Sequence, residues 1–211
     1  MTTTDLDSAA HVAVDWGTTR FRLWVLDGSG RVLAERRSGE GLAVAGAAGF
    51  EAVLEAHLAA LGLPEDLPVM LCGMVGSRGG WVEAAYLQTP IHLDYLVART
   101  TPVPGARRPV RILPGIAQRD IHEPDVLRGE ETQLLALSEV GPDSGLACLP
   151  GTHSKWVRLA QGRVQGFATF MTGELFQLLR SQSVLAPALE GAGAVAPDSA
   201  GFQAGVEAAL Q

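Results

Sequence analysis

The sequence predicts an α/β fold with two similar lobes, because short strand-like runs alternate with stretches whose apolar residues have helical spacing. Two hairpin-like stretches support the two lobes. Residues 12–32 and 146–164 each run strand, Gly-Thr turn, strand and a second turn that ends in Gly-Arg-Val. Gly17-Thr18 and Gly151-Thr152 are the only Gly-Thr pairs in the sequence. A repeated turn of this size is typical of two lobes that face each other across a nucleotide, so a phosphotransferase is the leading hypothesis.

Composition narrows the classes of protein to consider. Hydrophobic residues make up 47% of the 211 residues, which supports a real core and argues against wholesale disorder. The formal net charge is −7 without a basic cluster, which disfavours a nucleic-acid partner. The amino-terminal stretch lacks the features of a signal peptide, and no apolar run reaches the roughly 18 residues that span a membrane. We therefore expect a cytoplasmic protein without a membrane partner.

Cysteine and histidine content argues against a zinc site. Cys72 and Cys148 each lie in an apolar run, so we expect two buried, reduced thiols rather than a disulfide or metal ligands. The sequence has no Cys-x-x-Cys, and its five histidines are scattered.

The first lobe is predicted to contain several strands and two helices. Alternating or short apolar runs predict strands at 11–15, 20–26, 32–36, 69–72 and 110–113. Helical spacing predicts one helix over 50–61 and another that starts near Gly129. The proline-containing stretch 85–108 is interpreted as an irregular extension.

A break at Gly141-Pro142-Asp143 is the predicted domain boundary, with an N-terminal lobe over 1–141 and a C-terminal lobe over 142–211. After the second hairpin we expect a strand at 164–170, a helix at 173–184, a loop over 186–201 and a last amphipathic helix from Phe202. A lobe of about 70 residues buries a small fraction of its surface and is marginal alone. We therefore expect the second lobe to be incomplete.

Asp15, at the end of a strand and next to Gly-Thr-Thr, is a candidate phosphate and metal residue. The backbone N–H groups of such a turn can hold phosphate oxygens, and the carboxylate can order Mg²⁺ or its waters. An ordinary hairpin turn is the competing interpretation, and the repeat near Gly151 weakens it. The candidate nucleotide-binding residues are Gly17, Thr18, Thr19, Arg20, Gly151, Thr152, His153 and Ser154. Lys155 follows them and is interpreted as an exposed strand lysine.

These motifs carry a family resemblance. DWGTTRFRLWVLD and PGTHSKWVRL resemble the two phosphate loops of the sugar kinase/Hsp70/actin superfamily. CGMVGSRGGWVEAAYLQTP, LPGI, DVLRGEETQLLAL and FMTGELF narrow the resemblance to 2-dehydro-3-deoxygalactonokinases. The resemblance implies a two-lobed, actin-like ATPase (ribonuclease H-like) fold. It also implies phosphorylation of the terminal hydroxyl of 2-dehydro-3-deoxy-galactonate with ATP and Mg²⁺. The family's Gly-rich adenosine-binding segment has no counterpart in these 211 residues.

A kinase of this kind needs a carboxylate that accepts the proton of the sugar hydroxyl. Gly129-Glu130 aligns with the Gly-Asp that starts the equivalent helix in related sugar kinases, so Glu130 is the candidate base. Glu131 is the alternate base, and either carboxylate could instead serve Mg²⁺ or substrate. Acidic decoration of a first helical turn is the competing interpretation.

The sugar acid is expected to lie mainly on the first lobe. Arg78 can bind its carboxylate, with Ser77 assisting, although a surface arginine in a Gly-rich turn is the plain alternative. Trp81 and Tyr86 can wall the sugar pocket or pack in the core. The competing functions are a kinase for another sugar or sugar acid and a sugar-acid-binding protein without catalysis. A homodimer is possible with any of them.

Overall fold

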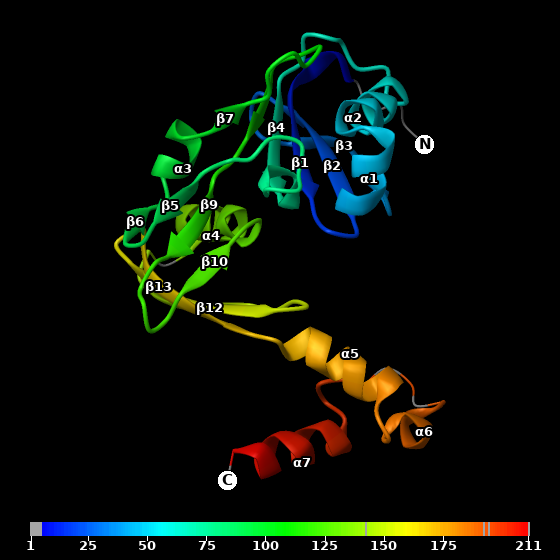
Figure 1. Cartoon of the computed structure of the whole chain (residues 1–211), viewed down its shortest axis with the longest axis vertical. Coiled ribbons are helices and arrows are strands. Elements are labelled where there is room, and N and C mark those ends of the chain that lie inside the picture. The colour runs from blue at the N-terminus through cyan, green and yellow to red at the C-terminus, as the bar shows by residue number, and fades with distance from the viewer. Residues whose placement is uncertain (1–5, 142, 192, 194, 211) are drawn as a thin grey trace. The chain divides into compact units, whose positions relative to one another are not determined.

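The computed structural model describes residues 6–141, 143–191, 193 and 195–210 (Figure 1). The chain forms two compact units. The first contains the described residues up to 149 together with 155–169, and the second contains 150–154 together with the described residues from 170. Pro142, in the predicted boundary, lies outside the described residues. The boundary between lobes stays a prediction, because contacts within this chain define compact units rather than lobes.

A six-stranded sheet forms the centre of the first unit, with the strand order β3-β2-β1-β4-β8-β7. Its strands are β1 (Ala9–Trp16), β2 (Phe21–Asp27), β3 (Val32–Ser38), β4 (Val69–Gly73), β7 (Thr101–Pro102) and β8 (Val110–Ile112). The pairs β1–β2 and β2–β3 are antiparallel, whereas β4 lies parallel to both β1 and β8. The structure therefore confirms the strands predicted in this lobe.

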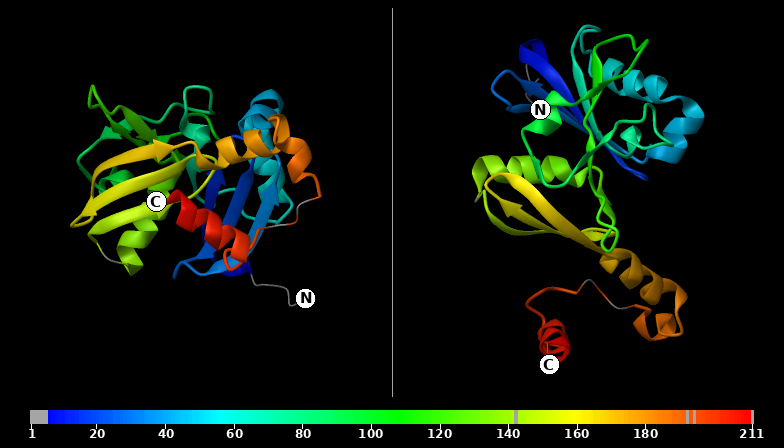
Figure 2. Two further views of the ribbon diagram at one scale, coloured as in Figure 1. Left: turned by 90° about the horizontal axis from the view of Figure 1, so that it is seen from below. Right: turned by 60° about the vertical axis from the view of Figure 1, so that its left-hand side comes forward.

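The two faces of this sheet differ because side chains alternate along each strand. Val12, Val14 and Trp16 of β1 are buried on the face covered by α1 (Leu42–Ala48) and α2 (Phe50–Ala59). Figure 2 shows both helices on one side of the sheet. The helix α2 matches the predicted helix, whereas α1 was not predicted. Asp15 belongs to the opposite set of β1 side chains, so the sheet presents it away from these two helices.

Two smaller sheets complete the first unit. One contains β5 (Tyr86–Gln88), β9 (Gly115–Gln118) and β10 (Asp125–Leu127), and the other contains β6 (Ile91–His92), β11 (Gly145–Leu149), β12 (Ser154–Ala160) and β13 (Arg163–Phe170). They share a second apolar core with α3 (Tyr95–Ala98) and α4 (Glu130–Val140). The stretch 85–108 is thus not an irregular extension, because it forms β5, β6, α3 and β7. These elements are too short for periodicity to reveal them.

The second unit is largely helical, with α5 (Thr172–Gln182), α6 (Ala186–Leu189) and α7 (Ala200–Ala209). The predicted helices at 173–184 and from Phe202 are confirmed, and α6 lies in the predicted loop. None of the described residues of these helices is buried. Among the described residues, no single helix has the length and apolar composition to cross a membrane, and α1 with α2 meet that test only as a pair bent by 95°.

Candidate functional site

The first turn, Gly17–Arg20, joins β1 to β2 and is closed by a bond from the Gly17 amide to the Arg20 carbonyl (2.9 Å). The amide of Leu42, the first residue of α1, donates to the Gly17 carbonyl (3.1 Å). Gly41 lies so close that a Cβ there would be 2.3 Å from the Thr18 carbonyl oxygen. Thr18, Thr19 and Arg20 remain exposed. The turn is therefore held from behind while its polar groups face outward.

Asp15 stands at the end of β1 and pairs with a cation on β2. In the antiparallel register Asp15 lies opposite Arg22, whose Nη2 donates to the Asp15 carboxylate. Burial raises the pKa of Asp15, and Arg22 opposes that shift by charge and by hydrogen bonding. Nε of Arg22 is buried and has no partner among the described residues. The turn is thus flanked by a carboxylate that a single guanidinium compensates.

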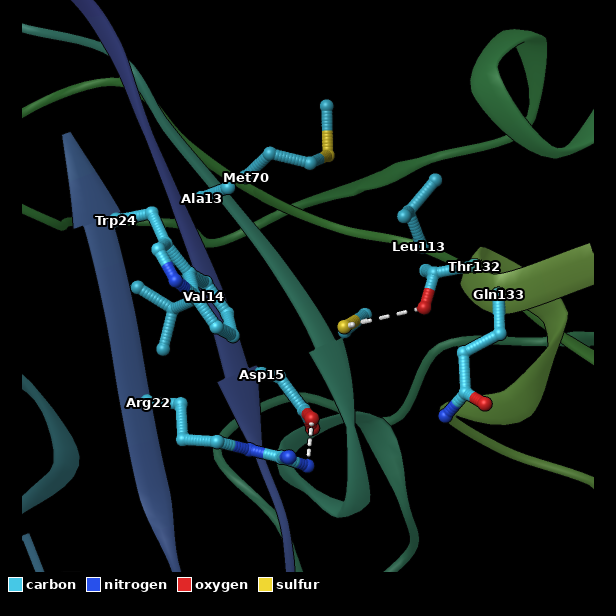
Figure 3. Close-up of a pocket in the computed structure, with 10 residues that line it drawn as sticks. Ala13, Val14, Asp15, Arg22, Trp24, Met70, Leu113, Thr132 and Gln133 are labelled. Carbon is cyan, nitrogen blue, oxygen red and sulfur yellow. Dashed lines mark hydrogen bonds and ion pairs between the residues drawn. The ribbon is translucent and has the colours of Figure 1, made fainter. Parts of the chain in front are cut away.

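A pocket of about 520 Å³ opens beside this ion pair (Figure 3). Strands β1, β2 and β4 form one wall, and the first turn of α4 contributes to another. The lining residues are Ala13, Val14, Asp15, Arg22, Trp24, Met70, Cys72, Leu113, Thr132 and Gln133. Cys72 is buried, and burial raises the pKa of its thiol, with further contributions from the charges of Asp15 and Glu131. Neither base candidate lines the pocket, although both precede Thr132 on α4.

The two carboxylates at the start of α4 have different surroundings. Glu130 is partly exposed, and one of its oxygens accepts a hydrogen bond from the Arg128 amide (3.0 Å). Glu131 has no exposed surface, and its Oε2 accepts from the Gly129 amide (2.6 Å). Its Oε1 has no partner among the described residues. Burial raises the pKa of Glu131 to about 7, although the bonds from backbone amides oppose the shift.

Gly73 lies close both to the end of β1 and to Gly129, which precedes α4. A Cβ on Gly129 would lie 3.5 Å from the Cα of Gly73. A Cβ on Gly73 would lie 2.8 Å from the Trp16 carbonyl oxygen and 3.2 Å from the Asp15 carboxylate. Both glycines have positive φ, 91° for Gly73 and 113° for Gly129, which side chains other than glycine rarely adopt. The end of β1 and the residue before α4 therefore both lie close to Gly73.

The residues predicted to bind the sugar acid fall into two environments. Arg78 is exposed and Ser77 is partly buried, in the loop that follows β4. Trp81 is partly buried against the first core and stacks on Phe50 with ring centroids 6.3 Å apart. The structure thus places Trp81 in core packing, the second of its two predicted environments.

Arg128 is a residue of this region that the sequence did not single out. Its guanidinium lies 4.0 Å from the centroid of the Tyr86 ring, and Nε donates to the Tyr86 hydroxyl (2.9 Å). Nη2 donates to the Ala84 carbonyl (2.7 Å), while Nη1 is buried and has no partner in the part of the chain that the structure describes. Tyr86 therefore holds an arginine. Because its partners lie more than 40 positions away, local sequence carries no signal for this arrangement.

The second turn, Gly151–Ser154, is fastened to the start of α5. The Glu174 amide donates to the Thr152 carbonyl (2.9 Å), and the Glu174 carboxylate pairs with Nε2 of His153. The hydroxyls of Ser154 and Thr172 share a hydrogen bond. A Cβ on Gly173 would lie 2.4 Å from the Gly151 carbonyl oxygen, so the helix begins directly against the turn.

Two side chains near this turn differ from expectation. Lys155 is buried rather than exposed: its Nζ donates to the Val126 carbonyl (2.7 Å) and the Thr169 hydroxyl (2.6 Å), and it lies 3.5 Å from Asp125. The nearby carboxylate offsets part of the free-energy cost of burying the ammonium. Cys148 is exposed, contrary to the expected pair of buried thiols, and both cysteines are free. Among the described residues, no group of three or more His, Cys, Asp and Glu side chains could hold a metal ion.

Comparison with known proteins places these features in a family. Residues 15–211 match the family model of 2-keto-3-deoxy-galactonokinase. A protein of Rhizobium meliloti strain 1021 described as a 2-dehydro-3-deoxygalactonokinase, DgoK1, is 53% identical over 193 residues. The 2-dehydro-3-deoxygalactonokinase of Escherichia coli K12 is 36% identical over 182 residues. These alignments cover 91% and 86% of this chain but only 63% and 60% of the relatives.

A solved structure agrees with the fold. A crystal structure of a Sinorhizobium meliloti protein described as a 2-dehydro-3-deoxygalactonokinase matches with a TM-score of 0.88 and 52% identity. The match covers 94% of this chain and 66% of that chain. The chain thus has the α/β fold of this solved structure. By its match to the family model over residues 15–211, the chain belongs to the 2-keto-3-deoxy-galactonokinase family.

Proposed function

We propose that this protein phosphorylates the terminal hydroxyl of 2-dehydro-3-deoxy-galactonate, with ATP as phosphoryl donor. Family membership and the names of the relatives support the substrate and the reaction class. One structural observation carries the proposal. The carboxylate of Asp15, beside an exposed Gly-Thr-Thr turn, lies close to Gly73, and so does Gly129, the residue directly before Glu130 and Glu131 at the start of α4. A phosphoryl transfer needs both a phosphate and metal site and a proton acceptor, and these are the groups that supply them.

Asp15 is the residue we propose to hold Mg²⁺, either directly or through its waters. Its carboxylate supplies the hard oxygen ligands that this ion prefers, and it lines the pocket beside the first turn. A bound Mg²⁺ would neutralise charge on the phosphates. Gly17, Thr18, Thr19 and Arg20 would contact phosphate oxygens through amides, hydroxyls and a guanidinium. The second turn, with Gly151, Thr152, His153 and Ser154, is proposed as another phosphate loop.

Glu130 is the proposed general base. It is partly exposed, so a substrate hydroxyl can reach it, whereas the carboxylate of Glu131 has no exposed surface and caps the Gly129 amide. In the proposed step Glu130 accepts the hydroxyl proton as the sugar oxygen attacks the γ-phosphorus of ATP, the bond from that phosphorus to the bridging oxygen breaks, and ADP leaves. We propose that Arg78, with Ser77, binds the carboxylate of the sugar acid, since an exposed guanidinium can contact both carboxylate oxygens.

The test is Glu130→Gln in the complete gene product, assayed with Mg-ATP and 2-dehydro-3-deoxy-galactonate. The amide cannot accept the proton, so kcat should fall by about 10²–10⁴-fold. Glu123→Gln, in an exposed loop, is the matched control and should leave kcat unchanged. Undiminished turnover by Glu130→Gln would remove Glu130 from this role.

A substrate panel separates this kinase from one that acts on another sugar or sugar acid. Calorimetric titration of the 211-residue chain with Mg-ATP tests the competing function of a sugar-acid-binding protein, which predicts no nucleotide binding. A cytoplasmic location and a homodimer are also proposals at this point, and size-exclusion chromatography with light scattering tests the dimer.

A further inference from the structure

A buried histidine behind the first turn has no part in the proposed reaction. His57 lies on α2 with 7% of its surface exposed, and its ring stacks on Phe21 with centroids 4.4 Å apart. Both ring nitrogens are nonetheless hydrogen-bonded. Nε of Arg36 donates to Nδ1 (3.1 Å), and Nε2 lies 2.7 Å from the Glu40 carboxylate. The two charged hydrogen-bond partners indicate a role for His57 beyond apolar packing.

The partners determine which nitrogen of His57 carries the proton. An arginine only donates hydrogen bonds, so Nδ1 must accept, and a neutral ring then carries its proton on Nε2. That proton is donated to Glu40. Hydrogen bonds from Ser38 and His57 lower the pKa of Glu40, which keeps the carboxylate charged at neutral pH. Arg36, His57 and Glu40 thus form a chain of hydrogen bonds with one direction, from guanidinium to imidazole to carboxylate.

Glu40 connects this chain of hydrogen bonds to the first turn through its backbone. Its carbonyl accepts a hydrogen bond from Nε1 of the fully buried Trp16 (2.8 Å), the residue just before the turn. The next residue, Gly41, leaves no room between itself and the turn, since a Cβ there would lie 2.3 Å from the Thr18 oxygen and 2.4 Å from the Thr19 Cα. Gly41 therefore lies directly against Thr18 and Thr19 of the turn, and Glu40 is hydrogen-bonded to the residue before the turn.

We propose that Arg36, His57 and Glu40 are positioning residues that fix the first turn in the conformation that binds the phosphates of ATP. A turn that is already ordered loses less conformational entropy when phosphate binds, and its N–H groups need no reorientation. This hydrogen-bonded chain of Arg36, His57 and Glu40, the relay, acts through the Glu40-Gly41 segment and touches no reacting atom. This inference rests on the proposed function only for the identity of the ligand, because the ordering of the turn is a property of the free protein.

Two variants of His57 test the relay. His57→Leu keeps the apolar packing on Phe21 but removes both hydrogen bonds. His57→Gln can replace both, because its carbonyl accepts from Arg36 and its amide donates to Glu40. Leu58→Ala is the matched control, since Leu58 is fully buried on the same helix and its truncation costs stability without touching the relay.

The first readout is amide hydrogen exchange in the free protein. The amides of Gly17 and Leu42 are hydrogen-bonded within and behind the turn. His57→Leu should reduce their protection about tenfold relative to Val14, the change expected for losing hydrogen bonds to charged groups, and His57→Gln should restore most of it. Unchanged protection of both amides in His57→Leu, or an equal loss in Leu58→Ala, would overturn the relay.

The second readout compares the KM for Mg-ATP with the KM for the sugar acid in the complete gene product. His57→Leu should raise the KM for Mg-ATP about tenfold and leave the KM for the sugar acid unchanged. If exchange changes as expected while nucleotide KM does not, the turn is ordered by the relay but is not a phosphate site for ATP, and the inference fails. A wild-type protein without activity on this sugar acid would contradict the proposed function alone, because Mg-ATP binding and exchange still test the relay.

Discussion

The two Gly-Thr turns have the same chain framework. In the first, β1, the turn, β2, β3 and α1 follow one another, and in the second the order is β11, the turn, β12, β13 and α5. In both, a glycine at the start of the helix is packed against the turn: Gly41 in the first and Gly173 in the second. The contact needs glycine because a Cβ at either position would meet backbone at 2.3–2.4 Å. The repeat seen in sequence is therefore a repeat of structure, including helices that pattern alone did not connect to the turns.

The turns differ in the groups that surround this common framework. Two residues before the glycine, the first turn has Asp15 and the second has Leu149. Both turns have backbone contacts to the helix that follows them. The first is further restrained by the buried Trp16, whereas the second is further restrained by side-chain pairs such as the exposed His153 and Glu174. A shared turn geometry can serve phosphate binding in both places. The carboxylate that we propose to hold Mg²⁺ precedes the first turn, whereas a leucine stands at the same position before the second.

The largest predicted effect tests this asymmetry of charge. Asp15→Asn keeps the shape of the side chain and an acceptor for Arg22, but removes the negative charge proposed to hold Mg²⁺. Because metal stabilisation of transferring phosphoryl groups is worth several kcal/mol, we expect kcat of the complete gene product to fall about 100-fold or more. Leu149→Met, at the equivalent position, should change kcat less than about threefold. If Asp15→Asn kept a third of the wild-type kcat, the charge at Asp15 would matter no more than the side chain at Leu149, and the proposed difference between the turns would be wrong.

The next effect concerns the buried acid of the first unit. The pKa of Glu131 is raised from 4.5 to about 7 in the folded protein. Between these values the unfolded chain releases the proton and the folded protein keeps it, so the free energy of unfolding falls as pH rises, in total by about 3 kcal/mol. Glu131→Gln should match the wild type near pH 4 and be more stable by this order at pH 8, measured by urea unfolding.

The control for this prediction is Glu139→Gln, an exposed position on the same helix, which should change stability by less than about 0.5 kcal/mol at every pH. A Glu131→Gln protein without extra stability at pH 8 would mean that the carboxylate finds a compensating partner for Oε1, the oxygen that has none among the described residues.

Substitutions at Gly41 and Gly173, the glycines packed against the two turns, should have smaller effects and compare the turns directly. Gly41→Ala forces Cβ against the backbone of Thr18 and Thr19. It should lower the free energy of unfolding, measured with urea, by about 1–3 kcal/mol. Gly173→Ala makes an equally close contact, but α5 has no buried residue to hold it and can shift, so its cost should stay below about 1 kcal/mol. Gly46→Ala, in α1 with open space around it, should be neutral or stabilising. Equal costs at Gly41 and Gly173 would show that both turns are held with the same rigidity.

Sequence reasoning succeeded where local pattern decides the structure. The hairpins were predictable because turn residues and alternation are local, and the start of α4 was predictable because a glycine followed by acidic residues is typical of a helix start. Lys155 was misjudged because its burial depends on Asp125, 30 positions away, which periodicity does not report. The pairing of Asp15 with Arg22 was within reach, since a tight hairpin places these two residues opposite each other. Arg128 was not, because its partners lie on a distant loop and strand.

The smallest predicted effect is at the second turn. His153 and Glu174 form an ion pair, yet their side chains are 46% and 41% exposed, and such pairs contribute about 0–1 kcal/mol because water screens them. Glu174→Gln should therefore change the free energy of unfolding by less than about 0.5 kcal/mol. A double-mutant cycle with His153→Ala should give a coupling energy that disappears in high salt. A coupling well above 1 kcal/mol that persists in salt would contradict this. The pair would then restrain its turn as firmly as Trp16 and Glu40 restrain the first, and the two turns would differ in chemistry but not in how tightly they are held.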